Sequence, residues 1–146
     1  MERKWTVITG TAGMDAHVIG TKILSLALKE AGFKVIELGC LTLPEDFVKA
    51  AQETNADAIL ISSLYGMADL DLKGFKEKCV ESGLDKVLLY IGGNLGMGRK
   101  EYEDFEKVRE KFEKLGFDRV YPPDVDLDLA IADLKSDLEK KKNMHS

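Results

Sequence analysis

Residues 56–66 read ADAILISSLYG and form the most continuously apolar stretch of the chain. An unbroken apolar run is typical of a strand covered on both faces, whereas a half-exposed strand alternates between apolar and polar residues. A second run of the same kind, KVLLYIGGN, occupies residues 86–94. Two such strands favour a parallel sheet that lies between two layers of helices.

The segments on either side alternate between strand and helix patterns. Shorter β-rich runs are WTVITG at 5–10, FKVIELG at 33–39 and FDRVYPP at 117–123. Apolar residues recur at helical spacing over 18–31, from Pro44 onward, and over about 71–82, 102–115 and 127–138. Five strand–helix units in succession predict an α/β domain with a flavodoxin-like, doubly wound, five-stranded parallel sheet of order 2-1-3-4-5. We expect one Rossmann-like domain over residues 1–140 and a disordered tail over residues 141–146.

Composition narrows the range of partners. The chain has 146 residues, 45% of them hydrophobic, and a net charge of −5. An acidic chain without a basic stripe is not expected to bind nucleic acid or anionic lipid. We expect no signal peptide or membrane span, because the N-terminus lacks a long apolar run. The two isolated cysteines, Cys40 and Cys79, suit the reducing cytoplasm.

The unusual residues gather on three loops that this fold brings together. The loop after the first strand reads TGTAGMDAHVIG (9–20), and the third and fourth strands end in SSLYGM (62–67) and GGNLGMG (92–98). In this strand order the carboxyl ends of the first and third strands border a ligand crevice. Asp15 could simply cap the first helix, with His17 exposed in its first turn. The coincidence of three such loops at one crevice favours a ligand site.

The sequences of these loops also indicate which classes of ligand the site could bind. TGTAG resembles a phosphate-binding loop only in part, and a receiver domain would place acidic residues after the first strand, where VITGTAG has none. Zinc would require further imidazoles or paired thiols near His17. A single imidazole can serve as the axial ligand of a metal that a macrocycle already holds, with a carboxylate such as Asp15 on its other ring nitrogen. Asp-x-His at a glycine-lined crevice therefore fits axial ligation of a corrin cobalt.

Three linked motifs carry a family resemblance. Asp15-Ala16-His17-Val18-Ile19-Gly20 matches DxHxxG, Ser62-Ser63-Leu64 matches SxL, and Gly92-Gly93 matches GG. The chain thereby resembles cobalamin-binding domains that hold cobalt through histidine, and over nearly its whole length it is similar to the small subunits of glutamate mutase (methylaspartate mutase).

The resemblance implies a set of site residues. His17 would be the axial cobalt ligand of adenosylcobalamin and Asp15 its hydrogen-bond partner. The displaced nucleotide tail would enter a slot between the sheet and the first helix, with Ser62 bonded to the benzimidazole and Leu64 packed on it. The implied cofactor-binding residues are Gly13, Met14, Asp15, Ala16, His17, Val18, Gly20, Ser62, Ser63, Leu64, Gly92, Gly93, Asn94, Leu95, Gly96, Met97 and Gly98.

The resemblance also implies a reaction and a partner. The reaction is the radical rearrangement of glutamate to 3-methylaspartate, and a separate large barrel subunit would bind the amino acid. Alternatives are a corrinoid carrier for methyl transfer, a mutase for another carbon skeleton, and a cobalamin-sensing module without catalysis. Methyl carriers usually have a helical cap before the first strand, and we expect none here because the first strand pattern begins at Trp5.

Overall fold

The computed structural model describes residues 5–11, 19–63, 72–93, 105–122 and 125–144. The elements follow the chain as β1 (Thr6–Thr11), α1 (Ile19–Glu30), β2 (Lys34–Glu37), α2 (Pro44–Thr54), β3 (Ala58–Ser63), α4 (Phe75–Glu81), β4 (Leu88–Gly93), α5 (Phe105–Lys114), β5 (Arg119–Tyr121) and α6 (Leu127–Met144). The five strands pair in parallel in the order β2-β1-β3-β4-β5. The predicted fold class and strand order are confirmed.

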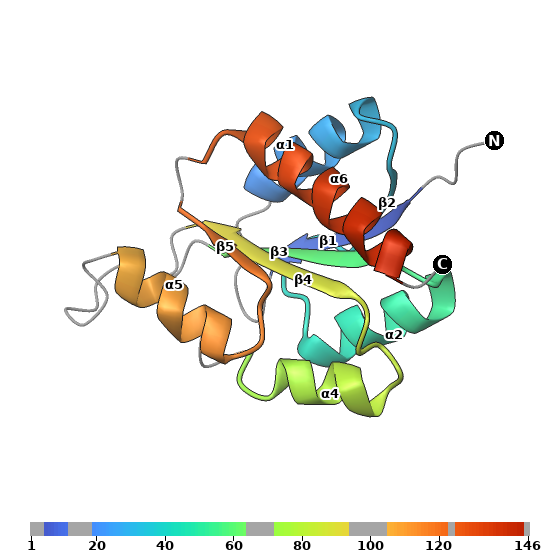
Figure 1. Cartoon of the computed structure of the whole chain (residues 1–146), viewed down its shortest axis with the longest axis vertical. Coiled ribbons are helices and arrows are strands. Elements are labelled where there is room, and N and C mark those ends of the chain that lie inside the picture. The colour runs from blue at the N-terminus through green and yellow to red at the C-terminus, as the bar shows by residue number, and fades with distance from the viewer. Residues whose placement is uncertain (1–4, 12–18, 64–71, 94–104, 123–124, 145–146) are drawn as a thin grey trace.

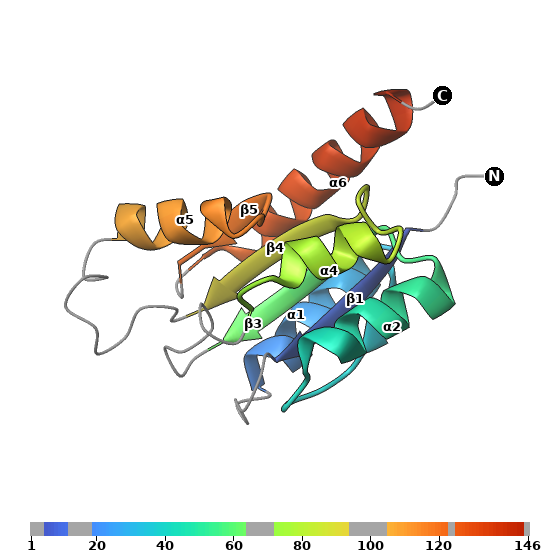
Figure 2. The same ribbon diagram turned by 90° about the horizontal axis from the view of Figure 1, so that it is seen from below.

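The sheet lies between two layers of helices, as the apolar runs of β3 and β4 require. Helices α1 and α6 lie side by side on one face, and α2 and α4 cover the other (Figure 1). Helix α5 packs beside β5 on the same side as α2 and α4 (Figure 2). We refer to these as the α1/α6 face and the α2/α4/α5 face.

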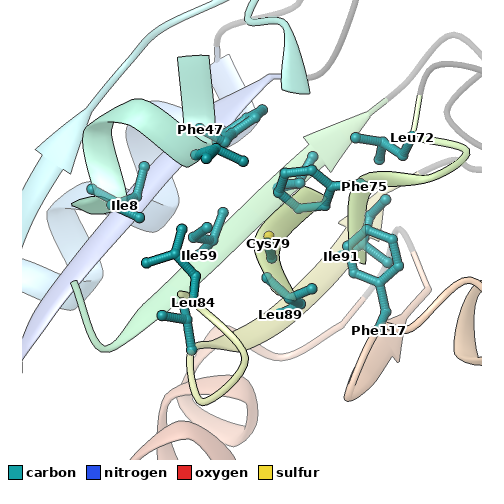
Figure 3. Packing of buried hydrophobic residues seen from close by; sticks show 14 of the residues in the cluster. Ile8, Phe47, Ile59, Leu72, Phe75, Cys79, Leu84, Leu89, Ile91 and Phe117 are labelled. Atoms are coloured by element: carbon teal, nitrogen blue, oxygen red, sulfur yellow. The ribbon is translucent and has the colours of Figure 1, made fainter. Parts of the chain in front are cut away.

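The core of the α2/α4/α5 face consists of apolar side chains in close contact. The ring of Phe75 packs edge-on against Phe47 at 6.0 Å between centroids and stacks on Phe117 at 6.2 Å. Ile8, Ile59 and other strand residues contribute aliphatic side chains to the same cluster (Figure 3). Because Phe47 and Phe75 are fully buried, this layer supplies much of the apolar surface removed from water.

The α1/α6 face holds a smaller apolar cluster. Leu28 of α1, together with Leu134 and Leu138 of α6, packs against the strands and is fully buried. Towards the carboxyl ends of the strands the buried residues of this face are hydroxyl-bearing: Thr9, Thr11, Thr21 and Ser25. The face therefore changes character along the strands.

Two helix boundaries differ from those predicted. Helix α4 was predicted to begin at about residue 71 but begins at Phe75. Gly74, directly before it, has a left-handed φ of 80°, which is incompatible with a right-handed helix at that position. Helix α6 continues to Met144, so residues 141–144, predicted to belong to a disordered tail, are helical. Lys141 and Lys142 lie in its last turn, where positive charge interacts favourably with the helix dipole.

Candidate functional site

A row of residues crosses the carboxyl edge of the sheet on the α1/α6 face. The register pairs Thr11 with Ser62, Ser62 with Gly92 and Gly92 with Tyr121. Because residues paired in register on neighbouring strands direct their side chains to the same face of the sheet, these four positions share one face. Four neighbouring strands thus present a hydroxyl, a second hydroxyl, a bare backbone and an aromatic ring.

A cavity of about 290 Å³ opens over Ser62, Gly92 and Tyr121 of this row, and we call it the α1/α6 cavity. Ile23 and Leu24 of α1 form one side, and Leu127 and Ala130 of α6 contribute to the other. Its lining from the sheet and the following loop is Leu60, Ile61, Ser62, Tyr90, Ile91, Gly92, Gly93, Tyr121, Pro122 and Val125. Small-molecule sites range over roughly 300–1,000 Å³, so this space suits one compact, mostly apolar ring system.

The two glycines that end β4 have different structural roles. Gly93 has a φ of 107°, and a Cβ there would lie 2.2 Å from the carbonyl oxygen of Ser63, so no other residue fits the backbone. At Gly92 a Cβ would lie 3.4 Å from the Cβ of Tyr121, an ordinary contact. The protein packing alone therefore tolerates alanine at Gly92. The missing side chain instead leaves room in the α1/α6 cavity.

Two buried pairs of hydroxyl groups fasten α1 to β1. Thr9 Oγ1 lies 2.8 Å from Ser25 Oγ, and Thr11 Oγ1 lies 2.7 Å from Thr21 Oγ1. Thr21 and Ser25 are four residues apart, on one side of the helix. Thr11 ends β1 and Thr21 lies in the first turns of α1, so this second bond joins the two described ends of the chain that flank the Asp15–His17 segment.

Hydrogen bonds and ion pairs between charged and phenolic side chains connect β4 and β5 with α6 beside the α1/α6 cavity. Tyr121 donates its hydroxyl to Asp133 Oδ2 at 2.7 Å, and Tyr90 donates to Asp137 Oδ2. Arg119 donates to both oxygens of Asp137, from Nε at 2.7 Å and Nη2 at 3.1 Å, and forms an ion pair with Asp133 at 3.6 Å. Both carboxylates come from α6, one turn apart.

The protonation states in this network follow from its geometry. Burial, and then the hydrogen bond to Asp137, raise the pKa of Tyr90 well above its usual range. Burial and the bond to Asp133 raise the pKa of Tyr121 in the same way. The hydrogen bond from Arg119 lowers the pKa of Asp137. Each phenol therefore stays a donor and Asp137 stays an ionised acceptor across the physiological range.

The described part of the chain contains some of the predicted site residues. Ser62, Gly92 and Gly93 line the α1/α6 cavity, and Gly20 belongs to α1. Ser63 is fully buried; strand alternation directs it to the opposite face, and its Oγ has no hydrogen-bond partner among the described residues. The predicted residues that lie outside the described ranges are Gly13, Met14, Asp15, Ala16, His17, Val18, Leu64, Asn94, Leu95, Gly96, Met97 and Gly98.

Sequence reasoning missed the two tyrosines of the cavity wall. Tyr90 lies two residues before Gly92, so strand alternation places both on one face. A tyrosine in a buried strand generally needs a partner for its hydroxyl. Asp133 and Asp137, spaced four apart in a helix, were the available signal.

Comparisons with known proteins agree with this architecture. A cobalamin-binding protein from Desulfitobacterium hafniense superposes with a TM-score of 0.65 at 20% identity, over 81% of this chain and 53% of that one. The monomethylamine corrinoid protein of Methanosarcina barkeri gives a TM-score of 0.64 at 24% identity, over 79% of this chain and 50% of that one. The chain thus spans about half the length of these two proteins, and the likeness establishes the fold.

Sequence comparison identifies the family. The model of the B12 binding domain matches residues 5–114. The glutamate mutase sigma subunit of Clostridium tetani is 48% identical over 97% of this chain and 100% of its own length. That of Carboxydothermus hydrogenoformans is 53% identical over 90% of this chain and 94% of its own. The chain therefore belongs to the B12-binding domain family and, within it, to the glutamate mutase sigma subunits.

Proposed function

We propose that the chain is the cobalamin-binding subunit of an adenosylcobalamin-dependent glutamate mutase, which interconverts L-glutamate and threo-3-methylaspartate. The observation that carries this proposal is the identity of about half of all residues with glutamate mutase sigma subunits over nearly the full length of both chains. The monomethylamine corrinoid protein of Methanosarcina barkeri shares the fold at 24% identity, which does not extend its activity to this chain.

The residues described at the carboxyl edge fit the nucleotide tail of the cofactor. The α1/α6 cavity lies between the sheet and α1, and its volume suits a benzimidazole but not a corrin ring. Ser62 offers a hydroxyl to a ring nitrogen, and Gly92 leaves the space that a Cβ would fill. We propose that these two residues hold the tail, together with Leu64 and the segment 94–98.

We further propose that His17 is the axial cobalt ligand and that Asp15 accepts a hydrogen bond from its other ring nitrogen. Such a partner fixes the tautomer of the imidazole and raises its basicity. The remaining loop residues from Gly13 to Val18, with Gly20, would lie beside the corrin. When bound, adenosylcobalamin supplies a weak cobalt–carbon bond whose homolysis starts radical chemistry. The chain itself binds, orients and shields the cofactor.

A separate large barrel subunit would bind the amino acid substrate and complete the enzyme. We assign the chain, through the end of α6 at Met144, to one cobalamin-binding domain. None of the helices in the described ranges is long and apolar enough to cross a membrane. Two free cysteines, Cys40 and Cys79, support a place in the cytoplasm.

The test combines this chain with a glutamate mutase barrel subunit, adenosylcobalamin and glutamate, and measures the formation of 3-methylaspartate. His17→Ala is expected to abolish turnover and to weaken cofactor retention. The chain has two histidines, so His145→Ala is the matched control and should retain full activity. Nitrogen splitting in the EPR spectrum of the Co(II) state should change when histidine is labelled with ¹⁵N. Full turnover by His17→Ala would contradict the proposal.

A further inference from the structure

We propose that Arg119, Asp133 and Asp137 are positioning residues that hold Tyr90 and Tyr121 as a fixed aromatic wall of the α1/α6 cavity. This wall sets the affinity of the chain for the nucleotide tail of cobalamin. The inference rests on the proposed function, since it assigns the α1/α6 cavity to the tail.

Tyr90 and Tyr121 contact both the cavity and charged side chains that lie outside it. Both residues line the cavity, and their ring centroids lie 5.9 Å apart at an interplanar angle of 59°. Their hydroxyls reach Asp133 and Asp137, and neither carboxylate lines the cavity. Asp137 and Arg119 border a separate hollow on the outer surface. Each tyrosine thus borders the cavity, while its hydroxyl is bonded to α6.

The carboxylates are themselves held in place. Arg119 contacts both oxygens of Asp137 in a bidentate pair, which fixes the plane of that carboxylate. The side chains of Asp137 and Asp133 are 18% and 24% exposed, so both carboxylates are largely shielded, whereas that of Arg119 is 38% exposed. Because Arg119 also pairs with Asp133, one guanidinium sets the positions of both acceptors.

A wall fixed in this way lowers the entropic cost of binding. A side chain that is immobilised only when a ligand binds costs about 0.5–1.5 kcal/mol of ordering, which corresponds to roughly 2- to 12-fold in affinity. Here the tyrosine rings are ordered when the chain folds, by bonds that the ligand does not touch. The benefit applies only to a ligand that contacts the rings, which is the tail rather than the corrin.

The experiment compares two probes on the full chain. Adenosylcobalamin carries the nucleotide tail, and adenosylcobinamide is the same corrin without it. We expect Tyr121→Phe and Asp133→Ala to weaken binding of adenosylcobalamin by roughly 3- to 10-fold. Binding of adenosylcobinamide should change by less than about 2-fold, because it does not reach the wall. Tyr121→Phe retains the ring and removes only the hydroxyl.

Glu139→Gln is the matched control, since it changes an exposed carboxylate of the same helix by the same charge. It should bind both probes as the unchanged chain does. Thermal unfolding identifies any variant that fails to fold. If Asp133→Ala does not fold, the conclusion rests on the binding measurements with Tyr121→Phe. If the ratio of the dissociation constants for adenosylcobalamin and adenosylcobinamide is the same in Tyr121→Phe as in the unchanged chain, the inference is wrong but the proposed function is unaffected. Failure of the unchanged chain to bind either probe would overturn the proposed function, and the inference with it.

Discussion

The face of the sheet covered by α2, α4 and α5 is filled by aromatic and aliphatic side chains, whereas the face covered by α1 and α6 carries hydroxyl pairs, an ion-pair network and a cavity. Both faces belong to the same five strands, so the difference lies in which residues alternate to each side. The core of the first face is a large cluster of apolar side chains. The second face is apolar mainly towards the amino ends of the strands and carries hydroxyl groups towards the carboxyl ends, where the α1/α6 cavity lies.

The comparison indicates that the core of one face of the sheet mainly determines the stability of the chain, whereas the cavity on the other face mainly determines ligand binding. A change on the α2/α4/α5 face should reduce the free energy of unfolding without reshaping the cavity. A change that fills the α1/α6 cavity without disturbing the backbone or a buried hydrogen bond should affect cofactor affinity more than stability. The following predictions test that separation, from the largest expected effect to the smallest.

Phe75→Ala should have the largest effect on stability. Its ring is fully buried between Phe47 and Phe117, so truncation removes apolar contacts and leaves a cavity. We expect a loss of about 3–5 kcal/mol in the free energy of unfolding, measured by denaturant titration. The folded fraction should bind cobalamin with unchanged affinity. Leu129→Ala on α6 is the control, because that side chain is 56% exposed; a similar loss from both variants would refute the separation.

The adjacent glycines Gly92 and Gly93 provide a matched pair. Gly93→Ala should cost about 2–3 kcal/mol in unfolding free energy, because the new Cβ meets the carbonyl of Ser63 and the φ is left-handed. Gly92→Ala should leave stability within about 0.5 kcal/mol but weaken binding of adenosylcobalamin by at least roughly 5-fold, by overfilling the cavity. Urea titration and equilibrium binding measure the two effects. The reverse order, with Gly92→Ala the less stable variant, would break the comparison.

Thr9→Val should have an intermediate effect, because it leaves the buried hydroxyl of Ser25 without its partner. We expect a loss of about 1–2 kcal/mol in unfolding free energy. The double variant Thr9→Val, Ser25→Ala removes both hydroxyls and should recover most of that loss. A double-mutant cycle by urea titration measures the coupling. Strict additivity of the two single changes would show that the hydroxyls do not interact.

Asp137 should give the smallest effect, visible as a dependence of stability on pH. Its pKa is lowered in the folded chain by Arg119, from the usual 3.8. The ionised carboxylate therefore contributes stability above that value, and the contribution is lost as the pH falls through the lower folded pKa. For a partly exposed pair we expect less than about 1 kcal/mol. The stability difference between Asp137→Asn and the unchanged chain should shrink as the solution is acidified; a constant difference would contradict this.

The fold was largely predictable because β3 and β4 are apolar on both faces, and only a sheet between two helix layers satisfies both. Helix ends were less predictable. The left-handed φ of Gly74 moves the start of α4 to Phe75. Helix α6 includes the lysines near its end, where a disordered tail was expected. Local backbone geometry decides such ends, and periodicity does not report it.

The site was predictable in part. Ser62 and Gly92 were selected from motifs, and the register places them side by side under the cavity. The network of Tyr90, Tyr121 and α6 was not predicted, because its partners are separated by 47 and 12 positions along the chain. Such pairs depend on how α6 lies against β4 and β5, which neither the strand order nor the helical periodicity specifies.

The bond between Thr11 and Thr21 has a consequence for how the histidine-bearing segment could evolve. Its two anchors are ten positions apart in sequence and are tied by the fold itself. Loop-closure entropy grows only slowly with length, by about 0.6 kcal/mol for each doubling. Insertions between these anchors are therefore tolerated thermodynamically. The segment that carries His17, proposed above as the cobalt ligand, could vary in length without rebuilding the domain.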